Sequence, residues 1–340
     1  MECHFLSSLN RLNFIDCYFR TEYETIIHAL NDIWRLTYLT HCHMDISLFN
    51  RSLIIVPFII STTLQSLSIE SYSYSLNQLT NLLKHSPLLR YLSILINDNT
   101  SNQPSTFSLQ YLTTLQLFEN GSQSTMMNLL RNSANLRLLI VKTDQIKMNG
   151  YDWQTIIVDH LPDLQVFKLM MIFRLNNNDN KKQHADNLLN SFRTSFWLEK
   201  HQWFVRCEWN RCEECDNNNL YLYTLPYAFE DYFIHDMKFC SKSTCRYDDD
   251  VSSYDRVQRL SLATSPLIGD ILPCFRFSQL HYIDLDFPFD TNLFAIITKF
   301  NRLVSIRITD YNTKHVSFTS SQFQDLLDRM PHLTSLQFNE

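Results

Sequence analysis

The residues best suited to chemistry are cysteines that gather in one part of the chain. Four of the nine cysteines form two pairs, Cys212 with Cys215 and Cys240 with Cys245, about 25 residues apart. Two such pairs can supply four thiolates to one zinc ion, which prefers tetrahedral coordination by sulfur and nitrogen. The alternative is a set of free thiols in a loop-rich segment. We therefore predict no metal and no cofactor, and keep these four cysteines as weak candidates for zinc ligands.

Combinations of residues that support catalysis do not stand out. Asp159-His160 and His235-Asp236 are adjacent acid–histidine pairs, but such neighbours arise by chance among 12 histidines. The chain has no G-x-S-x-G nucleophile elbow and no H-E-x-x-H motif. Its 3 glycines are too few for a glycine-rich loop that binds phosphate. We expect a protein that is not an enzyme.

A repeated apolar pattern indicates the elements that would position any site. Residues 112–120 are LTTLQLFEN and match L-x-x-L-x-L-x-x-N. Strand side chains alternate between the two faces of a sheet, so Leu115 and Leu117 are expected to point into a core and Phe118 away from it. Asn120 stands where an Asn or Cys side chain satisfies backbone groups between turns. The motif is the strand segment of a leucine-rich repeat.

Related segments recur along the chain at nearly constant spacing, 23 to 30 residues apart within each of two series. They begin at residues 9, 36, 64, 89, 112, 136 and 164, and again at 257, 280, 303 and 333. The segment at 36–42 is degenerate, and its register stays open. The intervals leave room for a helix, and apolar residues at helical spacing predict helices near 23–30, 76–83, 126–130, 153–160, 293–300 and 323–330.

This pattern predicts an α/β fold, a leucine-rich-repeat solenoid with a parallel sheet on its concave side and helices on its convex side. Residues 1–172 form the first array, 257–340 the second, and 173–256 an insertion. In the insertion, the β-prone segments 203–209 and 220–227 predict two paired strands, and polar loops are expected at 176–182 and 248–250. A doubly wound domain also alternates strands and helices, but eleven evenly spaced copies favour the repeat.

A repeat array has no central pocket and displays one long sheet face, which usually binds another macromolecule. An aromatic and aliphatic cluster on such a face is typical of a binding hot spot. The alternative is that the insertion or loops fold over these residues. The register assigns to the concave face Tyr91, Phe118, Leu138, Ile140, Lys142, Lys168 and Met170 from the first array, and Tyr282, Asp284, Asp286 and Arg307 from the second.

The net charge and the hydropathy of the chain limit which binding partners and which cellular compartment are expected. The net charge of -6 gives no bulk attraction to nucleic acid or to an anionic membrane. The most apolar window, residues 53–60, is too short to span a bilayer, and the first residues lack the pattern of a signal peptide. Nine cysteines without a secretory signal are expected to be reduced. We predict a cytoplasmic or nuclear protein that binds neither nucleic acid nor membrane.

The repeats resemble those of F-box proteins and of ribonuclease-inhibitor-like proteins, with Cys17, Cys42 and Asn120 at the end of the strand motif. In the insertion, WFVRC at 203–207 and LYTLPY at 222–227 are similar to a block that accompanies the repeats in a large group of F-box-domain-containing proteins. The resemblance covers nearly the whole chain. It implies the substrate-recognition part of a receptor for a cullin-type ubiquitin ligase, in which the F-box binds the ligase adaptor and the repeats hold the target.

The F-box itself is not expected in this chain, because the first repeat begins within ten residues of Met1. The resemblance therefore implies an adaptor partner only if an F-box lies upstream. Two other interpretations stay open: a free-standing leucine-rich-repeat scaffold without a ligase role, and a binding module stabilised by zinc. In all three, the expected partner is a protein on the concave face.

Overall fold

The structure is a computed structural model of the 340-residue chain, and it is an α/β fold in which most strands are parallel and helices are few. It divides into two compact units, residues 1–173 and 174–340, which are treated separately below. The structure describes residues 8–19, 23–48, 56–97, 109–120, 122–144, 146–176, 179–210, 218–234, 239–245, 254–262, 276–287, 296–310, 324 and 327–339.

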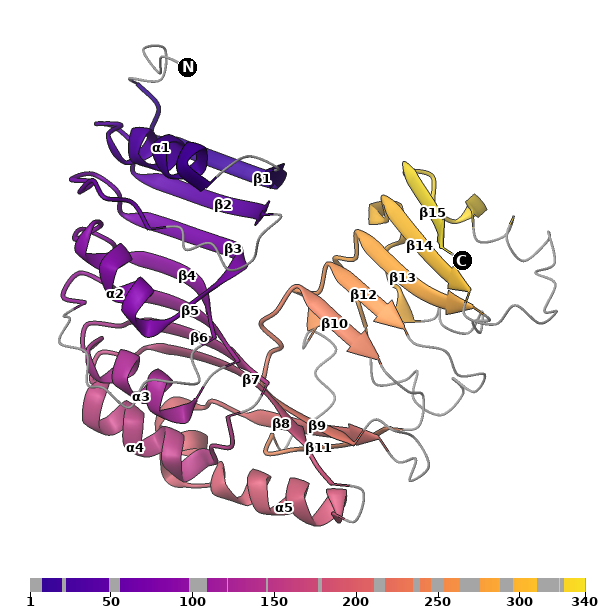
Figure 1. The fold of residues 1–340 in the computed structure, drawn as a ribbon. Coiled ribbons are helices and arrows are strands. Elements are labelled where there is room, and N and C mark those ends of the chain that lie inside the picture. The colour runs from indigo at the N-terminus through magenta and orange to yellow at the C-terminus, as the bar shows by residue number, and fades with distance from the viewer. Residues whose placement is uncertain are drawn as a thin grey trace. The chain divides into compact units, whose positions relative to one another are not determined.

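The first unit is built on a parallel sheet whose strands follow one another in space as they do in the chain (Figure 1). Each strand pairs in parallel with the next. The strands are β1 (Arg11–Phe19), β2 (His41–Leu48), β3 (Ser66–Tyr74), β4 (Tyr91–Ile96), β5 (Thr114–Glu119), β6 (Leu138–Thr143) and β7 (Val166–Arg174).

Apolar side chains at matching positions of these strands form the core. Leu115 and Leu117 are fully buried, which confirms the predicted alternation along β5. Burying a leucine side chain contributes about 1.5–3 kcal/mol, so each added strand strengthens the stack. The first inward position is occupied, from β1 to β7, by Leu12, Cys42, Leu67, Leu92, Leu115, Leu139 and Phe167.

The register of the second strand, which the sequence left open, places Cys42 differently from the expectation. Cys42 pairs with Leu12 and Leu67, so it stands at the first inward position and not at the end of the strand motif. The buried Leu39 precedes it as the leading leucine. A thiol substitutes for a leucine here because cysteine packs as a small apolar side chain. Burial raises the pKa of the Cys42 thiol to about 12, so the thiol stays protonated.

The end of β5 also differs from the expectation. Asn120 is exposed, whereas Glu119 is fully buried. The reason is that β5 extends through Glu119, so the alternation that turns Leu115 and Leu117 inward turns residue 119 inward as well. Asn120 therefore does not take the interior role predicted for it.

The helices described in this unit lie on one side of its sheet, and α2, α3 and α4 follow each other along it in Figure 1. Two of them begin with a capping box: Ser75 with Gln78 in α2, and Asn149 with Asp152 in α4. The apolar stripes predicted from helical spacing are buried, which confirms these helices. The helices are α1 (Tyr23–Trp34), α2 (Leu76–Lys84), α3 (Gln123–Arg131) and α4 (Gly150–His160).

The second unit begins with elements that the sequence indicated only in part. The predicted strand pair is confirmed as the antiparallel strands β8 (Val205–Asn210) and β9 (Asn219–Thr224). A third strand, β11 (Phe239–Ser243), pairs with the other edge of β8. Helix α5 (Lys181–Ser191) and a π-helix (Phe196–His201) precede them and were not predicted. Asn180 caps α5, so the loop expected at 176–182 ends two residues early.

A second parallel sheet completes this unit. Its strands are adjacent in the order β10 (Asp231–Ile234), β12 (Arg259–Leu262), β13 (Tyr282–Phe287), β14 (Ser305–Asp310) and β15 (Ser335–Asn339). Inward side chains such as Ile283 and Leu285 are buried as predicted.

The helix predicted at 293–300 is wrong over its described residues. Ile297 forms a parallel bridge with Phe277, and residues 300–302 are a short 3-10 helix. Ile296 and Ile297 are nevertheless buried, because two adjacent apolar residues can fill a core from either conformation. The acidic loop predicted at 248–250 lies outside the described residues. The helix predicted at 323–330 is described at residues 324 and 327–330, and residues 324, 327 and 328 are helical there, as predicted.

Candidate functional site

The candidate site is the outward face of the first sheet, defined as the strand positions that alternate with the buried ones. All seven residues predicted for a binding face in this unit occupy outward positions of β4–β7, and all are half-buried. The structure therefore brings together on one surface Tyr91, Phe118, Leu138, Ile140, Lys142, Lys168 and Met170.

The register arranges these side chains in rows across the strands. Phe118, Lys142 and Met170 form one row. Ile140 and Lys168 are neighbours in the row before it. Adjacent strands lie about 4.8 Å apart, so side chains within a row are in contact range. The result is a surface rich in apolar side chains, with two lysines among them and with Thr114 and Gln116 beside them on β5.

Tyr91 marks the polar border of this surface. Its hydroxyl donates a hydrogen bond to Gln116 Oε1 over 3.3 Å. Burial raises the pKa of Tyr91, the Glu70 carboxylate raises it further, and a hydrogen bond with Ser93 lowers it. The hydroxyl is therefore neutral and acts as a donor.

The outward face changes character toward β1. Ser66 and Ser68 of β3 and His41 and His43 of β2 occupy the positions that carry apolar groups on β6. His43 Nδ1 lies 4.0 Å from Glu70 Oε1, an ion pair when the histidine is protonated. The apolar cluster is thus confined to β4–β7.

In the second unit, the predicted face residues lie on the outward face of the other parallel sheet, where they pair among themselves. Arg307 Nη1 is 3.6 Å from Asp284 Oδ2, and Arg307 Nε donates to Gln337 Oε1 over 3.2 Å. The guanidinium lies over the Tyr282 ring, 5.5 Å from its centroid. The side chain of Asp286 is outside the described part of the structure. This face is polar, and its Arg307 is paired within the sheet, whereas the Tyr282 hydroxyl and Asp284 Oδ1 are buried without a hydrogen-bond partner among the described residues.

A buried polar cluster around Glu208 escaped the sequence analysis. Tyr223 of β9 donates a hydrogen bond to Glu208 Oε1 over 2.5 Å, and Tyr232 of β10 donates to Oε2 over 2.8 Å. Tyr254 lies 2.7 Å from the Tyr223 hydroxyl and 3.4 Å from Glu208 Oε1. Arg206 Nη1 donates to the Tyr254 hydroxyl over 2.6 Å. These contacts link the antiparallel strands to the parallel sheet of the second unit.

Burial is the main cause of the pKa shifts in this cluster. It raises the pKa of Glu208, although the three tyrosine hydrogen bonds and Arg206 oppose the shift. Burial also raises the pKa of Tyr223 and Tyr232 well above the ordinary range, so their hydroxyls are neutral donors. The cluster is closed to solvent, and we assign it a structural role. In the sequence, the segment VRCEWN at 205–210 could have indicated this cluster, because two charged residues alternate within a β-prone run.

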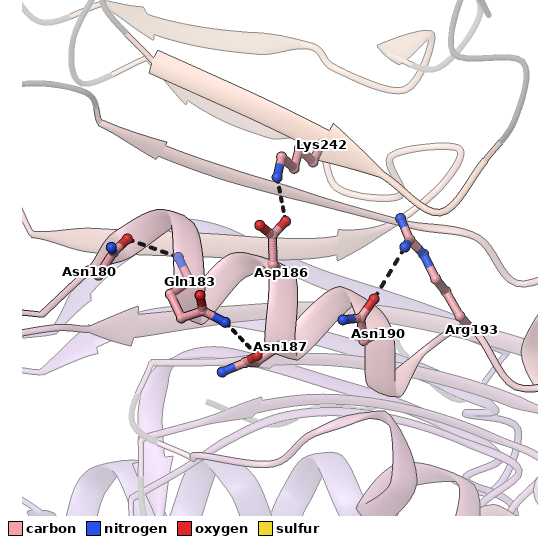
Figure 2. A network of polar contacts seen from close by, with 7 residues as sticks. All are labelled: Asn180, Gln183, Asp186, Asn187, Asn190, Arg193 and Lys242. Atoms are coloured by element: carbon pink, nitrogen blue, oxygen red, sulfur yellow. Dashed lines mark hydrogen bonds and ion pairs between the residues drawn. The ribbon is translucent and has the colours of Figure 1, made fainter.

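Helix α5 carries a separate polar network on its exposed side (Figure 2). Asp186 forms an ion pair with Lys242 of β11. Asn180 Oδ1 accepts from the backbone N–H of Gln183 over 3.0 Å, and Gln183 donates to Asn187 over the same distance. The Asp186–Lys242 pair is more than a third exposed, so its contribution is at most about 1 kcal/mol.

The two candidate zinc ligands that the structure describes, Cys240 and Cys245, lie too far apart to share one ion. Cys212 and Cys215 lie outside the described residues. Cys240 of β11 pairs with Trp209 of β8. The ladder between these strands continues to Thr244, whose N–H donates to the Val205 carbonyl over 2.9 Å. A strand rises about 3.3 Å per residue, so the ladder from Cys240 to Thr244 spans about 13 Å, and Cys245 follows at its far end. Zinc–sulfur bonds are about 2.3 Å long, so these two thiolates cannot share one ion.

Other clusters of metal-binding residues are also absent from the described part of the chain. No group of three or more His, Cys, Asp or Glu side chains is placed to hold a metal ion among the described residues. Cys207 is buried in β8, and burial raises the pKa of its thiol. None of the helices described is both long enough and apolar enough to cross a membrane.

Comparison with known proteins does not place the chain in a family. No model of a protein family matches it, and no curated protein matches its sequence.

Proposed function

We propose that the chain is a leucine-rich-repeat solenoid that binds a target protein on its outward face and acts as the substrate-recognition part of an F-box-type ubiquitin-ligase receptor. The observation that carries the binding role is the apolar cluster on β4–β7, where Phe118, Ile140 and Met170 are only half-buried on the side of the sheet opposite the helices.

The strand order supports the repeat architecture. In both sheets the parallel strands lie side by side in the order of the sequence. A doubly wound domain instead reverses its strand order at a switch point, where its ligands bind. Sequential stacking leaves no such crevice and favours recognition across a broad surface.

The size and chemistry of the cluster favour a protein ligand. Aromatic and aliphatic side chains on a polar surface are the usual centre of a protein interface, surrounded by polar groups that exclude water. Here the polar surround is supplied by Tyr91, Gln116 and the histidines of β2. The ligase role is supported by the resemblance of the segments 203–207 and 222–227 to F-box-associated sequence.

The binding role is tested by the double substitution F118A/I140A in the full chain, expressed in cells with a proximity-labelling enzyme. Truncating two hot-spot side chains removes about 1–2 kcal/mol each, so labelling of the target is expected to fall by about tenfold or more. The control is Y151A/V158A, which removes two exposed side chains of α4. Unchanged labelling in F118A/I140A would contradict the proposal.

The ligase role needs a separate experiment. If the target is a ligase substrate, its half-life should lengthen when this protein is deleted and shorten again when it is restored, but not when F118A/I140A is restored. The ligase adaptor should co-precipitate with the protein. A target whose half-life does not depend on the protein would leave a binding scaffold and remove the ligase role.

A further inference from the structure

The charges on the outward face of the first sheet have one sign where the apolar cluster lies. Between Tyr91 and Phe173, the charged side chains at outward positions of β4–β7 are Lys142 and Lys168. Asp144 is the next residue in the outward series of β6, but it follows the end of that strand. A basic surface is notable on a chain whose net charge is -6.

Lys142 is set among apolar side chains. Phe118 and Met170 are its partners in register on the neighbouring strands, and Ile140 precedes it by two residues on the same face. The side chain is half-buried. No carboxylate of the described residues lies within ion-pair distance of it. A partly desolvated ammonium without an opposite charge favours a carboxylate supplied by a ligand.

In the second unit, arginines on the face of the parallel sheet form ion pairs with carboxylates of the same sheet. Arg259 is paired with Asp231 over 2.6 Å, and Arg307 lies 3.6 Å from Asp284. Each arginine there has a carboxylate on the neighbouring strand. The contrast singles out Lys142 as a cation on a sheet face that has no carboxylate partner among the described residues.

We propose that the outward face of β4–β7 recognises an acidic–apolar segment of the target, and this rests on the proposed function. Apolar side chains of the segment pack on Phe118 and Ile140, while Asp or Glu carboxylates contact Lys142 and Lys168. The register places the two lysines diagonally on adjacent strands, about 8 Å apart at the backbone. In an extended peptide, carboxylates two residues apart are separated by about 7 Å, which matches that spacing.

The probe is a random-peptide phage library selected on the purified full chain. The wild type is expected to enrich peptides in which Asp or Glu alternates with apolar residues. The charge reversal K142E/K168E should enrich Lys or Arg in place of the acids, and should bind the wild-type peptides about tenfold or more weakly. The control K84E/K147E reverses two exposed lysines elsewhere and should select as the wild type does.

The variant F118A/I140A separates failure of this inference from failure of the proposed function. If F118A/I140A loses the enriched peptides but these show no acidic preference, or K142E/K168E selects them unchanged, the inference is overturned and the binding face stands. If peptides are enriched equally by all variants, this face does not bind them and both proposals fall. Absence of any enrichment overturns recognition of a linear segment, while the labelling experiment still judges the face.

Discussion

At the scale of single residues, burial determines what each charged group does. Glu208 is buried and accepts hydrogen bonds from three tyrosines, so its carboxyl group joins the antiparallel strands to the parallel sheet of the second unit. Lys142 is half-buried among apolar side chains, and no ion pair joins it to a carboxylate of the described residues. The thiol of Cys42 is buried and protonated, and it acts as an apolar side chain. The surroundings of each side chain therefore determine how an ionisable group behaves in the folded chain.

The raised pKa of Glu208 predicts a pH dependence of stability. Because burial raises the folded-state pKa above the ordinary 4.5, the folded chain keeps a proton at pH values where the unfolded chain has lost it. The free energy of unfolding should then fall as pH rises from about 4.5 toward the raised pKa, by at most about 1.4 kcal/mol per pH unit, and level off above it.

The variant E208Q checks this sign, since glutamine does not titrate. The fall with pH should be smaller in E208Q than in the wild type when urea unfolding is followed over a series of pH values. The control is E199Q, which changes an exposed glutamate of the π-helix and should keep the wild-type profile. Parallel profiles for the wild type and E208Q would show that Glu208 has the same pKa in the folded and unfolded chain.

At the scale of elements, the alternation along a strand separates residues that hold the fold from residues that display a surface. In β5, Leu115 and Leu117 are fully buried, whereas Gln116 and Phe118 are half-exposed. The same alternation carries Glu119 into the interior at the end of the strand. A single strand thus contributes to the core and to the candidate site at once.

Two substitutions in β5 should have opposite consequences. Leu115→Ala leaves a cavity in a close-packed core and is expected to lower the free energy of unfolding by about 2–5 kcal/mol. Phe118→Ala, three residues along the same strand, should lower it by less than about 1 kcal/mol because its side chain lies at the surface. Chemical denaturation of both variants checks this. An equal loss of stability would assign Phe118 to the core.

At the scale of the whole molecule, the parallel strands of each sheet lie side by side in sequence order, so burial depends on a strand's place in its sheet. In the second unit, Ile283 and Leu285 of the interior strand β13 are 1% and 0% exposed. The corresponding side chains of the outermost strand β15, Leu336 and Phe338, are 37% and 63% exposed. Each strand relies on its neighbours for stability.

This gradient predicts unequal protection of the backbone. Amide hydrogens of β15 should exchange with solvent faster than those of β13, since local opening of β15 exposes less new apolar surface. Hydrogen–deuterium exchange followed by mass spectrometry measures both strands in one sample, and β14 provides an intermediate reference. Equal protection across β13, β14 and β15 would mean that the sheet opens only as a whole.

The candidate site could be predicted from the sequence because alternation is a local property. Once Leu115 and Leu117 were assigned to the core, the outward position of Phe118 followed, and the same reasoning placed Ile140 and Lys142. Helix α5 was missed because its polar sequence buries little beyond Ala185 and Leu189, so its apolar stripe is short. The helix predicted at 293–300 was wrong because adjacent isoleucines fit a bridge as well as a helix.

By itself the sequence determined the parallel strands, their buried faces and the side chains of the outward face, since period and alternation act over a few residues. Only the tertiary structure decided the register of β2, the interior position of Glu119 and the cluster around Glu208. The tyrosines of that cluster come from β9, from β10 and from residue 254, and contacts between residues so far apart in the chain have no local period. The same holds for the separation of Cys240 and Cys245, which depends on the conformation of β11 and not on their spacing in the sequence.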